Sequence, residues 1–286
     1  MNPTAPAVDA ETAARWARLL DELRKLPGAV VAFSGGVDSS LVLLAAREAL
    51  RDRVLAVTAR SATYTPLEEE SARELAARLG ARWQAVDTDE LSDPAFRANP
   101  PERCYLCKRE LLTKLRAIAA QAGGAAVLEG SNVDDLADFR PGRRAVEELG
   151  VRSPLLEAGL TKTQVRALAR AHGLPNWDRP AAACLASRVP YGEELSVQRL
   201  RRIGAAEQAL RDRGFVVVRV RDHGAVARVE VGADELPRLL EPALRDGVVA
   251  DLKAVGYTWV ALDLEGYRTG GMNEGLVVGD RGPRRG

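Results

Sequence analysis

The chain has 286 residues, of which 46 % are hydrophobic, enough to build one large domain or two modest ones. Its 41 basic and 40 acidic residues nearly cancel, which argues against the basic surface of a nucleic-acid-binding protein. No apolar stretch approaches the ~20 residues of a membrane-spanning helix, and the first eleven residues do not resemble a secretory signal. We therefore expect a cytoplasmic protein that binds neither nucleic acid nor membrane.

Alternating helix and strand patterns run from the N-terminus to about residue 172 and predict a parallel sheet with helices on both faces. The first predicted strand is a short apolar run, as a buried central strand of a parallel sheet requires. Thr65, Pro66 and Glu68 form a capping box that begins one of the helices. The predicted strands are 30–33, 54–58, 82–86, 125–128 and 153–156, and the predicted helices are 12–26, 39–50, 66–80, 103–123 and 161–172.

The pattern changes after residue 173. Residues 174–192 predict a long irregular loop, and loops of this length in compact domains usually carry function. Beyond it we expect a smaller α+β domain. Its predicted elements are helices at 196–213, 233–245 and 246–255 and strands at 215–220, 226–231 and 257–264. The predicted organisation is a first domain over 1–192, a second over 193–278 and a disordered tail over 279–286.

A glycine-rich turn joins the first predicted strand to the helix that follows. Two adjacent glycines let backbone N–H groups face a ligand, and the helix start adds its positive end, so the turn is a phosphate cradle. It lacks the lysine of the common nucleotide-triphosphate loop. It carries an aspartate instead, which suits a Mg²⁺ ion held between two anions. The turn is Ser34, Gly35, Gly36, Val37, Asp38, Ser39 and Ser40.

Ligands of open parallel sheets bind at the carboxyl ends of the strands. Ala59 and Arg60 follow the second predicted strand, so we expect them near the base or ribose of a bound nucleotide. Gly130 follows the fourth, in a polar loop over 129–135, and is expected at the same site.

The chain has three cysteines. Cys104 and Cys107 lie one helical turn apart at a helix start and share one face, whereas Cys184 lies in the long loop. A single CxxC supplies only two ligands, so the cysteines by themselves do not decide whether the protein binds a metal. A closed zinc site would need a histidine from a chain with only two. An iron–sulfur cluster with one open iron would use three thiolates.

Several motifs together resemble a known family. The turn at 34–39 resembles the SGGxDS loop of PP-loop ATP pyrophosphatases, which split ATP into AMP and pyrophosphate. Nearly the whole chain resembles the LarE family, whose pattern is matched at 129–135, 140–142, 153–155 with Lys162, 179–188 and 263–268. The resemblance implies an α/β PP-loop ATP pyrophosphatase (adenine nucleotide alpha hydrolase-like) domain with a smaller C-terminal α+β domain.

LarE proteins make the nickel-pincer nucleotide cofactor of lactate racemase and related enzymes. They adenylate a carboxylate of pyridinium-3,5-biscarboxylic acid mononucleotide with ATP and convert it to a thiocarboxylate. In one branch the cysteine at the position of Cys184 is the sulfur donor and is consumed. In members with an extra CxxC, three cysteines hold a [4Fe-4S] cluster that passes on a sulfide. Because this chain has all three, we expect Cys104, Cys107 and Cys184 to hold a cluster that a sulfide or sulfur donor refills, in a homohexamer.

Further side chains have expected roles, and for Lys162, Arg219 and Arg221 the resemblance implies them. Lys162 is expected at the ATP phosphates, with a surface lysine as the alternative. The expected substrate-binding residues are Arg179, Ser187, Arg188, Arg219 and Arg221, with solvated surface charge as the alternative for Arg179 and Arg188. Glu207 and Asp263 are expected near a metal or phosphate. Among the tryptophans, Trp177 is expected to stack on the pyridinium ring, and the core is predicted to contain Trp16, Trp83 and Trp259.

Three other functions compete with this interpretation. A PP-loop tRNA thiolase also uses a three-cysteine cluster, but the balanced charge counts against RNA binding. An amidotransferase-type synthetase would use ammonia and have no need of Cys104 and Cys107. A nucleotide-sensing module would bind ATP and never cleave it.

Overall fold

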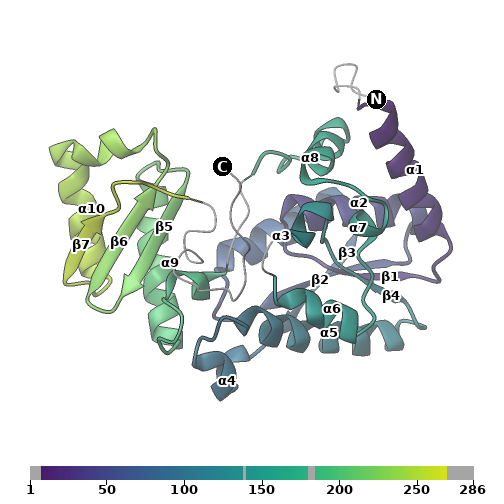
Figure 1. The fold of residues 1–286 in the computed structure, drawn as a ribbon, viewed down its shortest axis with the longest axis horizontal. Helices are drawn as coiled ribbons and strands as arrows, with labels where there is room; N and C mark the ends of the chain where they lie inside the picture. The colour runs from purple at the N-terminus through teal and green to yellow at the C-terminus, as the bar shows by residue number, and fades with distance from the viewer. Residues whose placement is uncertain (1–7, 138–139, 180–183, 269–286) are drawn as a thin grey trace, which may run out of the picture. The chain divides into compact units, whose positions relative to one another are not determined.

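The computed structural model describes residues 8–137, 140–179 and 184–268. Two compact units, Met1–Ala183 and Cys184–Gly286, make up the chain, and Figure 1 shows their elements. The predicted tail at 279–286 lies outside the described residues, as do four residues of the predicted long loop, 180–183. None of the helices in the described ranges is long and apolar enough to cross a membrane.

The first unit is built on a four-stranded sheet in the order β3-β2-β1-β4, in which every neighbouring pair is parallel. The central strand β1 is buried on both faces, with Val30 and Val31 fully inaccessible to solvent. This confirms the predicted parallel sheet. The strands are β1 (Ala29–Ala32), β2 (Val54–Arg60), β3 (Arg82–Asp87) and β4 (Ala126–Leu128).

Helices cover both faces of this sheet, as Figure 1 shows. Side chains of α1, α2, α3 and α8 form one apolar core with one face, and those of α5 and α6 form a second core with the other. The helices are α1 (Ala10–Arg24), α2 (Val37–Leu50), α3 (Pro66–Arg78), α4 (Pro94–Arg97), α5 (Arg103–Gln121), α6 (Gly142–Glu148), α7 (Pro154–Glu157) and α8 (Lys162–Ala171), with 3₁₀ turns η1 (Glu90–Ser92) and η2 (Val133–Leu136).

One predicted strand of the first unit is wrong. Residues 153–156 lie in and just before the helical turn α7, and only Arg152 forms a bridge to β4, at Leu128. Pro154 explains the difference, because it has no N–H to donate to a sheet and its fixed φ suits the first position of a helix. The short helix α6 was not predicted, because it has too few turns to show a clear apolar periodicity.

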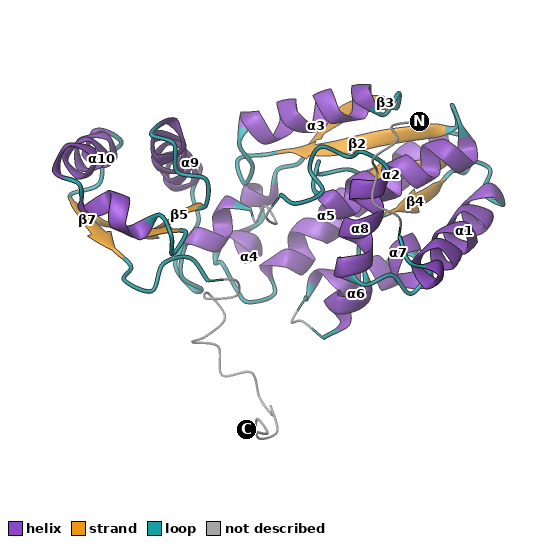
Figure 2. Ribbon diagram, turned by 90° about the horizontal axis from the view of Figure 1, so that it is seen from above, coloured by secondary structure: helices purple, strands orange, loops and turns teal. Residues whose placement is uncertain are grey.

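The second unit has a three-stranded sheet in the order β5-β6-β7, with β5 and β6 antiparallel and β6 and β7 parallel. Helices α9 and α10 share an apolar core with one face of this sheet and lie side by side in Figure 2. The predicted α+β class is confirmed. The elements are η3 (Leu185–Arg188), α9 (Val197–Asp212), β5 (Val218–His223), β6 (Val226–Val231), η4 (Leu236–Leu240), α10 (Pro242–Ala254) and β7 (Trp259–Leu262).

Three predictions for the second unit need correction. The strand placed at 215–220 begins three residues later, at Val218. The predicted helices 233–245 and 246–255 are instead the turn η4 and the helix α10, because Pro242 begins a new helix after the extended Glu241. Trp259 is 65 % exposed rather than part of the core. Its neighbour Val260 packs into the core, so strand alternation turns Trp259 to the other face.

A buried carboxylate ties α9 to the sheet of the second unit. Asp222 is fully inaccessible to solvent. Its oxygens accept hydrogen bonds from Arg199 Nε at 2.7 Å, the Arg202 guanidinium at 2.6 Å and the Tyr257 hydroxyl at 2.8 Å. Burial alone would raise the pKa of Asp222, but hydrogen bonds from Arg202, Tyr257 and Arg199 outweigh it and hold that pKa below its ordinary value. The charged form of Asp222 therefore stabilises the fold.

Replacing Asp222 by asparagine is expected to lower the free energy of unfolding by about 3 kcal/mol at neutral pH, because two arginines lose a buried anionic partner. Since its pKa is depressed, the contribution of Asp222 is present above about pH 4 and is lost as the pH falls further. Urea unfolding between pH 7 and pH 3 should thus show a flatter acid dependence for Asp222→Asn than for the wild type. Asp212→Asn, at an exposed position of α9, is the control. Equal unfolding free energies at all pH values would contradict this role.

Candidate active site

The glycine turn joins β1 to α2. Gly36 is the N-cap of α2, and Gly35 has φ +71° and lies so close to α3 that a Cβ there would be 3.3 Å from Ala72 Cα. The Ser39 and Ser40 hydroxyls donate to the Gly36 carbonyl at 3.0 and 2.8 Å. That carbonyl is therefore turned inward and satisfied. The turn has the compact strand–loop–helix backbone that the sequence predicts, and its role as an anion cradle stays a prediction.

Two side chains from later in the chain bind the aspartate of this turn. Lys162, at the start of α8, donates through Nζ to Asp38 Oδ2. Asn132 donates through Nδ2 to Asp38 Oδ1 at 3.2 Å. Lys162 is positioned by a capping box in which Thr161 and Gln164 bond each other's backbone N–H groups. The structure thus brings together the carboxylate and the ammonium that the sequence assigns to the ATP phosphates.

The loop after β4 lies against the same turn. A Cβ on Gly130 would be 2.9 Å from the backbone nitrogen of Ser39, so only glycine fits there without movement. On the neighbouring strands, Ala59 pairs with Val86, and Arg60, which is half-exposed, pairs through Nε with Asp87 at 2.7 Å. These strands end at the edge of the sheet that also carries the turn, as parallel pairing requires.

Sequence reasoning missed the role of a buried carboxylate at the start of this loop. Glu129 is 4 % exposed and accepts from Lys108 Nζ at 2.7 Å, the Ser131 hydroxyl at 2.9 Å and the Ser153 hydroxyl. Burial would raise the pKa of Glu129, but the Lys108 ammonium and the serine hydroxyls outweigh it and lower that pKa. A lysine directly after the CxxC and a glutamate at a strand end were the available signals, but nothing in the sequence pairs them.

Cys104 and Cys107 lie in the first two turns of α5, the former exposed and the latter half-buried. The Cys107 thiol donates to Glu90 Oε1 at 3.3 Å, and the Thr88 hydroxyl donates to the same oxygen. Across the described residues, no three histidine, cysteine, aspartate or glutamate side chains are grouped as metal ligands. Cys184 belongs to the second unit, so the three-cysteine set stays a prediction.

Cys184 immediately precedes η3 and is held by its backbone. Its carbonyl accepts from the Ser187 hydroxyl at 2.8 Å and from Arg188 at 3.0 Å. Arg188 is 3 % exposed and pairs through two nitrogens with the buried Glu207, at 2.7 and 3.1 Å. Arg188 is therefore not solvated surface charge, whereas Arg179, in the first unit, is exposed.

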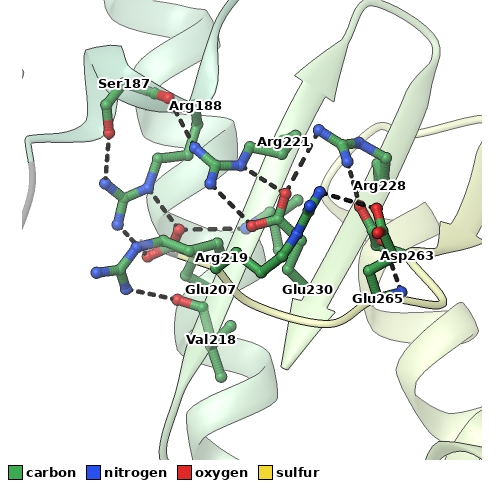
Figure 3. A network of polar contacts seen from close by, with 12 residues as sticks. Ser187, Arg188, Glu207, Val218, Arg219, Arg221, Arg228, Glu230, Asp263 and Glu265 are labelled. Atoms are coloured by element: carbon green, nitrogen blue, oxygen red, sulfur yellow. Dashed lines mark hydrogen bonds and ion pairs between the residues drawn. The ribbon is translucent and has the colours of Figure 1, made fainter. Parts of the chain in front are cut away.

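A network of arginines and carboxylates continues from η3 onto the sheet of the second unit, as Figure 3 shows. Arg219 and Arg221 lie on the same face of β5, as predicted, and are 9 % and 5 % exposed. Arg221 forms a two-nitrogen pair with Glu230 at 2.8 Å and donates to the Ser187 carbonyl at 2.9 Å. Arg228 contacts both Glu230 and Asp263.

Burial and the neighbouring Arg188 lower the pKa of Arg219, because each disfavours its charged form. Burial would raise the pKa of Glu207, but Arg188, Arg219 and Arg211 outweigh it, so that pKa lies below the ordinary value. Among the described residues, five guanidinium groups, those of Arg188, Arg211, Arg219, Arg221 and Arg228, share the three carboxylates of Glu207, Glu230 and Asp263. This excess of positive charge favours an anionic ligand.

Trp177 lies in the segment after α8 and is partly buried against the core of the first unit. The Arg170 guanidinium lies over its ring, 4.8 Å from the ring centre. Stacking of Trp177 on a pyridinium ring stays a prediction.

Comparison with known proteins identifies the family. The NAD synthase family model matches residues 16–124. The chain is 42 % identical over 269 residues to the pyridinium-3,5-bisthiocarboxylic acid mononucleotide synthase of Lactiplantibacillus plantarum, covering 94 % of this chain and 97 % of that protein. The chain belongs to the LarE family. It is also 41 % identical over 262 residues to an uncharacterized protein of Synechocystis, covering 90 % of this chain and 98 % of that protein.

The similarity to an NH₃-dependent NAD⁺ synthetase of Finegoldia magna is weaker: 29 % identity over 172 residues, or 58 % of this chain and 69 % of that protein. Membership of the LarE family, with its PP-loop, implies that the chain uses ATP and Mg²⁺. Asp38 fits the metal, because its carboxylate is accessible in part and already attracts a cation, the Lys162 ammonium.

Proposed function

We propose that this LarE-family protein uses ATP to convert a carboxylate of pyridinium-3,5-biscarboxylic acid mononucleotide into a thiocarboxylate, a step in making a nickel-pincer nucleotide. The observation that carries the proposal is the contact of Lys162 with Asp38 at a phosphate-cradling turn, in a chain that covers 97 % of a thiocarboxylate synthase. The turn supports activation by ATP, and the relative supports the identity of the acid.

Adenylation solves the chemical problem that such an acid poses. A carboxylate is a poor electrophile because it cannot expel oxide, whereas an acyl adenylate expels AMP. When the substrate carboxylate attacks the α-phosphorus of ATP, pyrophosphate leaves and its negative charge grows. Backbone N–H groups of the turn, the positive end of α2 and the Lys162 ammonium are arranged to stabilise that charge. Mg²⁺ bound by Asp38 would supply further positive charge to the phosphates.

The arginine network of the second unit supports binding of the substrate's own phosphate. Arg188, Arg219 and Arg221 are buried, so an anion that reaches them is screened little by water. Each is positioned before ligand arrives, Arg188 and Arg221 by Glu207 and Glu230 and Arg219 by the Val218 carbonyl. We assign Ser187 to the same site because its hydroxyl contacts Arg188. Arg179 is assigned with it from the family pattern alone.

For the sulfur step, we propose that Cys104, Cys107 and Cys184 hold a [4Fe-4S] cluster. Sulfide or another sulfur donor replaces the sulfur that the cluster passes to the substrate. Cys104 and Cys107 support this by lying one helical turn apart at a helix start, where the helix dipole favours thiolates. A cluster would keep sulfur deprotonated at a pH where a free thiol of pKa ~8.5 is mostly protonated. The alternative donor within the same reaction is Cys184 itself. We further propose a cytoplasmic homohexamer.

The test is to combine the cluster-reconstituted protein with ATP, Mg²⁺, the biscarboxylic mononucleotide and sulfide under anaerobic conditions. AMP, pyrophosphate and thiocarboxylate are expected in equal amounts. In a parallel reaction ammonia replaces sulfide. Release of pyrophosphate together with formation of an amide in that reaction would favour an ammonia-dependent synthetase. Tight tRNA binding at physiological salt, with no turnover of the mononucleotide, would favour a tRNA thiolase.

A further inference from the structure

A buried asparagine reaches the nucleotide turn from far along the chain. Asn176 lies in the segment after α8 and is 5 % exposed. Its Nδ2 donates one hydrogen bond to the Gly35 carbonyl at 2.8 Å and another to the Ser40 hydroxyl at 3.0 Å. Both N–H bonds of the amide are therefore directed at the turn, one at its glycine backbone and one at the first turn of α2.

These two bonds determine where backbone N–H groups point. In a planar trans peptide the C=O and the following N–H point in opposite directions. Binding of the Gly35 carbonyl by Asn176 therefore turns the Gly36 N–H to the side away from Asn176, where it donates to the Ser34 hydroxyl at 3.3 Å. The Ser40 hydroxyl passes the effect on, since it accepts from Asn176 and donates to the Gly36 carbonyl at 2.8 Å. This second link adds to the bonds from the Ser39 hydroxyl and the Ser40 N–H that already hold the Gly36 carbonyl, and so helps to orient the Val37 N–H.

We propose that Asn176 is a positioning residue of the nucleotide turn. It holds the carbonyls of Gly35 and Gly36 away from the phosphates and presents the Val37 N–H group to them. The Gly36 N–H lies beside it and exchanges its bond to the Ser34 hydroxyl for a phosphate oxygen when the nucleotide binds. Gly35 needs this support because its left-handed φ, open mainly to glycine, leaves the peptide intrinsically free to rotate. The inference rests on the proposed binding of ATP at this turn and is independent of the sulfur step.

A packing role alone does not explain this side chain. Asn176 Oδ1 is buried and has no hydrogen-bond partner among the residues that the structure describes. A buried acceptor without a partner destabilises the fold, and an apolar side chain of similar size would avoid that cost. The two hydrogen bonds that Nδ2 donates to the turn therefore explain why residue 176 carries an amide.

The test compares Asn176→Leu, which keeps the size and removes both donors, with Asn176→Asp, which keeps the shape and replaces the donors by acceptors. The affinity for a non-hydrolysable ATP analogue with Mg²⁺ is measured by calorimetry, without the mononucleotide or a sulfur source. We expect about tenfold weaker binding for Asn176→Leu, equivalent to about 1.4 kcal/mol. A larger loss is expected for Asn176→Asp, because its carboxylate faces the Gly35 carbonyl. Asp178→Asn, at an exposed position two residues away, is the control and should bind as the wild type does.

The thermal midpoint of each variant separates positioning from packing. A folded Asn176→Leu protein that binds the analogue with wild-type affinity would overturn the proposal. If the Asn176 variants do not fold, Ser40→Ala decides the question, because it cuts the link to Gly36 while Asn176 stays. Binding about threefold weaker would support the proposal, and unchanged binding would overturn it. If the wild type binds the analogue but makes no thiocarboxylate, the proposed function fails and this inference stands.

Discussion

Replacing Cys184 by serine is expected to reduce thiocarboxylate formation to the uncatalysed background while pyrophosphate release continues. Serine keeps the size of the side chain, and the contacts of Ser187 and Arg188 with residue 184 run through its backbone carbonyl, so the local structure should survive. What is lost is the sulfur atom, either as a cluster ligand or as the donor. The two products are followed separately, thiocarboxylate by mass spectrometry and pyrophosphate by a coupled assay.

Matched serine variants of Cys104 and Cys107 show which sulfur chemistry operates. If a cluster is the source, each variant should lose sulfur transfer and the iron-dependent absorbance together. If Cys184 alone is the donor, the Cys104 and Cys107 variants should complete one turnover as the wild type does. Sulfur transfer by Cys184→Ser at the wild-type rate would contradict both possibilities.

Replacing Asp38 by asparagine is expected to lower the rate of pyrophosphate release about 10²- to 10³-fold, the range seen when a preorganised electrostatic contact to a transition state is removed. The variant keeps a side-chain oxygen for the contact with Lys162 but loses the charge that suits Mg²⁺. Initial rates are measured over a range of Mg²⁺ concentrations.

The control for this variant is Asp21→Asn, at a site on α1 where the side chain is 66 % exposed. It removes the same charge at a solvent-exposed position outside the turn and should leave the rate unchanged. A wild-type rate for Asp38→Asn at limiting Mg²⁺ would show that Asp38 does not hold the metal.

The fold was largely predictable because its signals are local. The glycine turn lies within twelve consecutive residues, and three of the four strands of the first sheet, β1, β2 and β4, are mainly apolar runs. The error at 153–156 arose because Pro154 and the leucines after it are equally typical of a short strand and of a helical turn. Trp259 was misplaced because residue type does not show which face of an edge strand is covered.

The site was predictable only where its residues belong to a single sequence motif. Asp38 and Lys162 were expected near the phosphates from their motifs, but their direct contact joins positions 124 residues apart. The contacts of Asn176 and Glu129 could not be predicted for the same reason, since their partners lie on other elements and no spacing rule connects them. Tertiary structure supplies these pairs.

The most direct test of the account is a single anaerobic turnover of the cluster-reconstituted protein with ATP, Mg²⁺ and the biscarboxylic mononucleotide, followed by mass measurement of product and chain. We predict that the product exchanges one oxygen for sulfur while the mass of the polypeptide stays unchanged. A chain lighter by the mass of H₂S would identify Cys184 as the donor and contradict the cluster, and a product without sulfur would contradict the proposed reaction itself.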